Sequence, residues 1–99
     1  MTHVTLDNIK KSINKYSDYL QNTYNVSNIG VFGSVSRGQQ TKTSDLDILI
    51  ELSQPLGIYK FLELEDFLGK ILKKKVDLVT KKALKPAIKE KVLKEVIYV

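Results

Sequence analysis

The chain has 99 residues, no cysteine and a formal net charge of +5. That length indicates one domain over residues 1–99, and the lack of cysteine excludes disulfides, thiolate nucleophiles and cysteine zinc sites. The positive charge favours anionic partners such as nucleotides, nucleic acid or an acidic protein surface, although many small domains carry as much. Because the first residues do not resemble a secretion signal and no apolar run could span a bilayer, we expect a cytoplasmic protein without a membrane partner.

The hydrophobic periodicity indicates alternating helices and strands. Near the N-terminus it predicts an amphipathic helix over residues 6–21 with Thr5 as its N-cap. The elements that follow are a strand at 27–33, a turn of helix at 34–38, a strand at 45–52, a helix at 57–74, a strand at 76–80 and a last helix at 84–96 with Pro86 in its first turn. The order α-β-α-β-α-β-α predicts an α/β (α+β) fold in which helices pack on a small, mixed, three-stranded sheet.

The lengths of the connections predict which ends of the strands meet. Only ten residues separate Gly33-Ser34 from Asp45, too few for a parallel crossover, so the first two strands should be antiparallel. A full helix joins the second strand to the third, which suits a parallel pair. Gly33-Ser34, Asp45, Asp47 and Asp77 should therefore converge at one end of the sheet.

Such a convergence has a chemical use. Side chains alternate along a strand, so Asp45 and Asp47 point to one face, and their carboxylates are ligands that Mg²⁺ prefers. Two ions, with Asp77 completing the second site or accepting a proton, could organise a displacement at phosphorus. Taken singly, each aspartate is more often an edge charge, and it is their shared position that favours the catalytic interpretation.

Gly33, Ser34 and Arg37 extend this hypothesis to the phosphates. Glycine lets a ligand approach the backbone closely, and a short helix beginning at Ser34 would turn free N–H groups toward an anion. The Ser34 hydroxyl adds a donor. Arg37, one turn further on, would neutralise phosphate charge or pair with an aspartate. Alone, a Gly-Ser pair is a common turn and Arg37 is more often a surface residue.

The stretch "GSVSRGQQTKTSDLD" resembles the signature of the minimal nucleotidyltransferases of the DNA polymerase β-like superfamily: Gly33-Ser34, ten residues, then Asp45-Leu46-Asp47. Asp77 in "KVDLV" matches the family's third carboxylate, and the element order matches over almost the whole chain. The resemblance implies the nucleotidyltransferase fold, ATP as donor, and Mg²⁺, with Mn²⁺ as a substitute. It also implies an antitoxin that transfers AMP to a tyrosine of a separately encoded HEPN-domain ribonuclease toxin.

Two other functions remain open on the sequence. The same fold could neutralise a toxin by covering its surface without catalysis, or it could transfer a nucleotide to a small molecule or nucleic acid. The second is less favoured because a chain this short has no room for an acceptor-binding domain. A partner protein that presents the hydroxyl would supply what is missing. One or two of four helical aromatics, Tyr16, Tyr19, Phe61 and Phe67, are expected at that partner surface.

Overall fold

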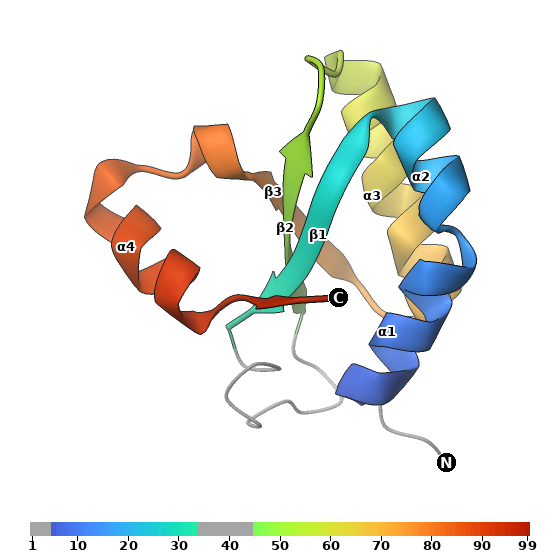
Figure 1. Ribbon diagram of the computed structural model, residues 1–99, viewed down its shortest axis with the longest axis horizontal. Coiled ribbons are helices and arrows are strands. Elements are labelled where there is room, and N and C mark those ends of the chain that lie inside the picture. The colour runs from blue at the N-terminus through green and yellow to red at the C-terminus, as the bar shows by residue number, and fades with distance from the viewer. Residues whose placement is uncertain (1–4, 34–44) are drawn as a thin grey trace.

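The computed structural model of the protein describes residues 5–33 and 45–99, and these form one sheet with helices on both sides (Figure 1). In chain order the elements are α1 (Leu6–Lys15), α2 (Ser17–Tyr24), β1 (Val26–Phe32), β2 (Leu46–Leu52), α3 (Ile58–Leu72), β3 (Val76–Thr80), the 3-10 helix η1 (Lys81–Ala83), α4 (Pro86–Glu95) and β4 (Ile97–Tyr98). Within the described ranges, none of the helices combines the length and the apolar character that crossing a membrane demands.

The first helical segment is divided in two, where the periodicity predicted a single helix. Thr5 does cap α1, since its Oγ1 accepts a hydrogen bond of 3.2 Å from the Asn8 amide. At Tyr16 the backbone leaves the helical region (φ −110°, ψ 16°), and α2 then continues to Tyr24. Asn25 ends α2 in the left-handed conformation, which asparagine tolerates better than most residues. The helical segment therefore ends at Tyr24, three residues beyond the predicted end at residue 21.

The strands lie in the order β3-β2-β1-β4. The β1–β2 pair is antiparallel and the β2–β3 pair is parallel, which confirms both predicted orientations. The predicted number of three strands is wrong, because β4 pairs antiparallel with β1 through Gly30↔Tyr98 and Val31↔Ile97. The helical spacing that included Val96 ends earlier in the structure, since Val96 has extended backbone angles (φ −64°, ψ 136°).

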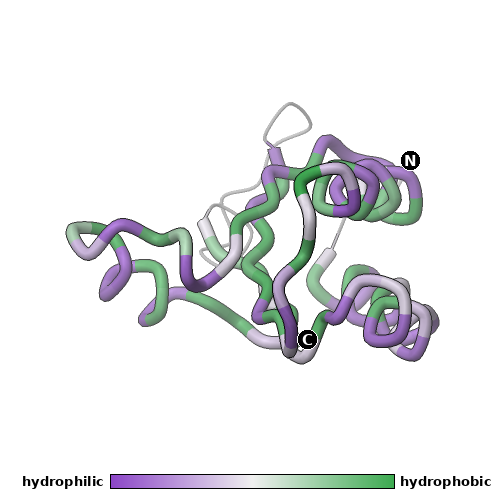
Figure 2. Tube along the Cα trace, turned by 90° about the horizontal axis from the view of Figure 1, so that it is seen from above, coloured by the Kyte–Doolittle hydropathy of each residue, from purple (hydrophilic) through white to green (hydrophobic). Residues whose placement is uncertain are grey.

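The two faces of the sheet differ in what covers them. Figures 1 and 2 show α1, α2 and α3 together on one side of the strands and α4 on the other. The alternation along β2 sends Leu46, Ile48 and Ile50 into the apolar core beneath α1–α3. Asp47, Leu49 and Glu51 consequently belong to the opposite face, which we call the α4 face.

Candidate active site

Two of the predicted carboxylates occupy paired positions in the sheet. Asp47 of β2 is the register partner of Asp77 of β3. Paired residues of neighbouring strands project to the same face, and the strands are about 4.8 Å apart. Asp45 stands one residue before β2 begins and is exposed, whereas Asp47 is half-buried and Asp77 is exposed. The structure thus brings all three to the beginning of the two parallel strands.

Local hydrogen bonds hold these two strand ends in place. The Leu46 amide donates to the Lys75 carbonyl at 2.9 Å, which ties the start of β2 to the residue before β3. On the outer edge of the sheet, the Leu78 amide donates to the Glu65 carboxylate of α3 at 3.1 Å. An edge strand leaves such amides without a strand partner, so Glu65 satisfies this one and fixes β3 against α3. Asp77 lies between these two bonds.

Gly33 lies against the Asp47 side chain. It follows β1 directly, is buried, and has a φ of +76°, a value that favours glycine. A Cβ atom built on Gly33 would stand 3.2 Å from Asp47 Cγ and closer still to a carboxylate oxygen. The position therefore favours glycine for two reasons. Its backbone angle suits glycine, and the Asp47 carboxylate occupies the space that a side chain would need.

The other two residues predicted to hold phosphate, Ser34 and Arg37, lie outside the described residues, as does the short helix expected at 34–38. Their roles stay predictions. Gly33 is the described part of the predicted cradle, and it lies at the end of the sheet that carries the aspartates.

The donor set suits magnesium bound together with a nucleotide. Among residues 5–33 and 45–99, no three acidic or histidine side chains are gathered as a complete metal site. Mg²⁺ commonly takes only one or two carboxylates from the protein and completes its shell with water and substrate phosphates. Asp47 with Asp77 or Asp45 offers that number of carboxylates, so these residues would hold the ion once a triphosphate shares it.

Paired carboxylates beside a glycine turn are compatible with metal-assisted transfer of a nucleotidyl group. The chain belongs to the nucleotidyltransferase domain family, whose model matches residues 13–99. Protein adenylyltransferase MntA of Thermococcus cleftensis is 40% identical to it over 99 residues, which is 100% of both chains.

Solved structures agree with this assignment. One, of a candidate minimal nucleotidyltransferase, has a TM-score of 0.82 at 28% identity and covers 98% of each chain. Another, of a toxin–antitoxin with the ATP analogue AMP-PNP, has a TM-score of 0.70 at 26% identity and covers 93% of this chain and 69% of that one. The predicted α+β nucleotidyltransferase fold is confirmed, and the chain is an MntA-like nucleotidyltransferase.

Proposed function

We propose that this protein transfers AMP from ATP to a hydroxyl side chain, most simply a tyrosine, of a HEPN-type toxin encoded beside it, and so silences that toxin. The observation that carries the proposal is the pairing of Asp47 with Asp77 beside Gly33. It occurs in a chain alignable from end to end with a protein adenylyltransferase. A solved relative that is a toxin–antitoxin with an ATP analogue supports both the donor and the kind of partner.

The chemistry assigns a role to each residue. The acceptor oxygen attacks the α-phosphorus of ATP, the bond from that phosphorus to the bridging oxygen breaks, and pyrophosphate leaves. Asp77 takes the proton of the hydroxyl, or stays a metal ligand while solvent takes it. Asp45 and Asp47 would hold magnesium, which would neutralise phosphate charge and lower the barrier to displacement. Gly33 lets the phosphates approach the backbone, and Ser34 and Arg37 add donors to them.

Intact mass spectrometry tests the transfer. The HEPN-type partner, incubated with this protein, ATP and Mg²⁺, should gain one or more units of roughly 329 Da as pyrophosphate is released. Asp47→Asn should slow the gain on the order of a thousandfold, because it removes a charge that holds the metal. Asp18→Asn, at an exposed carboxylate on α2, is the matched control and should leave the rate unchanged.

The same samples separate catalysis from simple covering of the toxin. Toxicity assays should show that silencing follows the mass gain, so the Asp47→Asn protein should bind the partner without silencing it. If the partner is silenced by this variant at equal concentration and never gains mass, neutralisation is by occlusion and the enzymatic proposal fails.

A further inference from the structure

A half-open groove lies at the end of the sheet opposite the aspartates. It has a volume of about 530 Å³ and is bounded by the residues that follow β2, by η1 and by α4. Leu52, Pro55 and Leu56 form its apolar side, and Leu52 and Leu56 are continuous with the core. The lining also includes three lysines, Lys81, Lys82 and Lys89. We call this feature the lysine groove.

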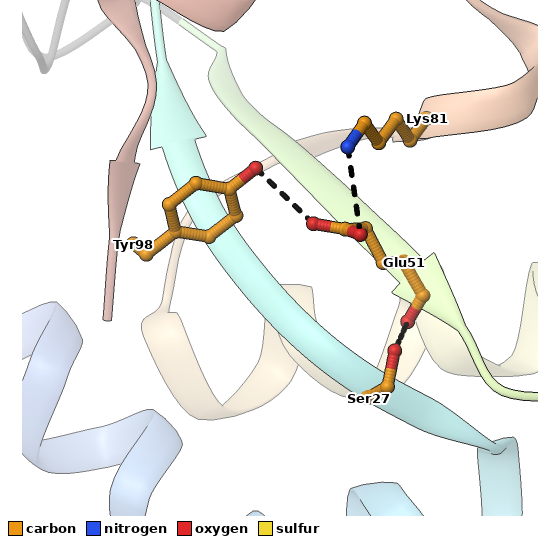
Figure 3. A network of polar contacts seen from close by, with 4 residues as sticks. All are labelled: Ser27, Glu51, Lys81 and Tyr98. Carbon is orange, nitrogen blue, oxygen red and sulfur yellow. Dashed lines mark hydrogen bonds and ion pairs between the residues drawn. The ribbon is translucent and has the colours of Figure 1, made fainter.

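A polar network fixes one wall of the lysine groove (Figure 3). Glu51 receives a hydrogen bond of 3.2 Å from the Tyr98 hydroxyl and an ion pair of 3.7 Å from Lys81. The Ser27 hydroxyl donates to the Glu51 carbonyl at 3.0 Å. Four segments far apart in sequence are therefore joined at one residue. Lys81 is partly exposed and already has Glu51 as an ion-pair partner, so its charge is partly offset within the protein.

The remaining two cations of the groove are available. Lys82 and Lys89 are exposed, and neither forms an ion pair within the part of the chain that the structure describes. They belong to a strongly basic region, since residues 81–99 contain six lysines and two glutamates, a net +4 of the chain's +5. Lys82 and Lys89 therefore lie beside apolar side chains without an ion-pair partner among the described residues. Such a surface matches a ligand that is both acidic and apolar.

The position and the walls of the groove narrow the choice of ligand. Glu51 is four residues along β2 from Asp47, about 13 Å at strand geometry, so the groove is separate from the nucleotide end. Among the residues that the structure describes, the lining includes no aromatic side chain on which a base could stack, although stacking supplies much of the affinity for single-stranded nucleic acid.

We infer that the lysine groove docks an acidic segment of the acceptor protein, with an apolar side chain against Leu52 and Leu56 and carboxylates at Lys82 and Lys89. This inference rests on the proposed function, because the docked protein is the one that receives AMP. The lysine groove would be a second contact with the partner, remote from the aspartates. It would set the affinity for the partner without changing the rate of the chemical step.

Charge reversal tests the docking surface. The double variant Lys82→Glu/Lys89→Glu should weaken binding to the HEPN-type partner, measured by calorimetry, on the order of tenfold or more at low salt. The KM for the partner should rise, while kcat at saturating partner and the affinity for ATP stay near those of the parent. The matched control is Lys10→Glu/Lys11→Glu on α1, which makes the same change in charge at exposed positions on the other side of the sheet.

The outcomes distinguish this inference from the proposed function. If the groove variant and the control have equal affinity and equal KM for the partner, the docking surface is wrong even where AMP transfer occurs. The same holds if the parent protein and the HEPN-type partner do not bind each other. Loss of binding in the groove variant alone supports docking even if the partner never gains mass, in which case only the proposed reaction fails. Unfolding curves for both variants confirm that the comparison is made between folded proteins.

Discussion

Gly33 is the residue at which backbone geometry and the candidate chemistry meet. Its φ of +76° disfavours any other residue by about 1–2 kcal/mol, and an added Cβ would displace the Asp47 carboxylate. We therefore expect Gly33→Ser to lower the free energy of unfolding by about that amount, measured by urea denaturation. The affinity for ATP with Mg²⁺, measured by calorimetry, should also fall, and by more than the loss of folding stability alone would cause.

A second glycine provides the control for this experiment. Gly57 is the N-cap of α3 and has a φ of −65°, and none of the described residues comes within 4 Å of a Cβ added there. Serine is also a favoured N-cap, so Gly57→Ser should leave both stability and ATP affinity as they are. If Gly33→Ser binds ATP as well as Gly57→Ser does, the phosphate cradle is elsewhere.

The position of the aspartates was predictable because it depends on few rules. A short connection makes neighbouring strands antiparallel, a helical connection makes them parallel, and side chains alternate. Those rules place the three aspartates at one end of the sheet without any knowledge of packing, whereas the register that pairs Asp47 with Asp77 comes from the structure. The contact between Gly33 and the Asp47 carboxylate follows from no such rule, since it depends on how the chain leaves β1.

At the scale of elements, the errors fall where tertiary contacts override local pattern. Leu6 to Leu20 has an unbroken apolar period, yet the helix breaks at Tyr16 and Leu20 is buried from a second helix. Similarly, β4 has two residues, too few for an alternation to be read, and it exists because β1 offers it an edge. The strong strand of β2 and the long helix α3, by contrast, differ from their predicted bounds by two residues or fewer.

The small strand β4 depends on a glycine in its neighbour. A Cβ on Gly30 would stand 2.7 Å from Val96 Cγ2, 3.1 Å from the Ile97 carbonyl oxygen and 3.2 Å from the Tyr98 ring. Side chains can move, but the carbonyl belongs to the pairing itself. We expect Gly30→Val to cost about 1–3 kcal/mol of stability and to detach β4. Hydrogen exchange should then show loss of protection at the Val99 amide, which bonds the Ile29 carbonyl at 3.0 Å.

Tyr98→Phe is the counterpart for that experiment. It keeps the ring over the sheet and removes only the hydroxyl that donates to Glu51. Because this bond is exposed, its loss should cost less than about 1 kcal/mol, and the Val99 amide should stay protected. Equal protection of that amide in Gly30→Val and in the parent would show that β4 does not need the glycine.

Across the whole molecule, apolar side chains are divided between one core and an exposed set. Of the aromatics expected at a partner surface, Tyr16, Phe61 and Phe67 pack against the core, while Tyr19 is 43% exposed. Ile58 and Leu62, which fit the core stripe of their helix, are exposed instead, together with Tyr59. Periodicity identifies the apolar side of α3 but cannot tell how far the neighbouring helices reach along it.

Tyr24 lies among the aromatic rings of Tyr19 and Phe67 and contributes to the stability of the fold at alkaline pH. The ring of Tyr24 is buried between α2 and α3, and it lies 5.7 Å from that of Tyr19 and 6.5 Å from that of Phe67. Burial raises the pKa of Tyr24 far above its ordinary range, and a hydrogen bond with Tyr19 and the nearby Glu63 carboxylate add to the rise. The folded protein thus retains a proton that the unfolded chain releases above about pH 10.

Since the unfolded state then binds fewer protons than the folded state, the free energy of unfolding must fall as pH increases. The contribution of Tyr24 is intact below pH 10 and is lost above it by about 1.4 kcal/mol per pH unit. We expect Tyr24→Phe to resemble the parent at pH 7 and to lose stability less steeply between about pH 10 and 11.5. Urea midpoints measured across that range test this. Parallel curves for the two proteins would mean that Tyr24 ionises in the folded state as readily as in the unfolded chain.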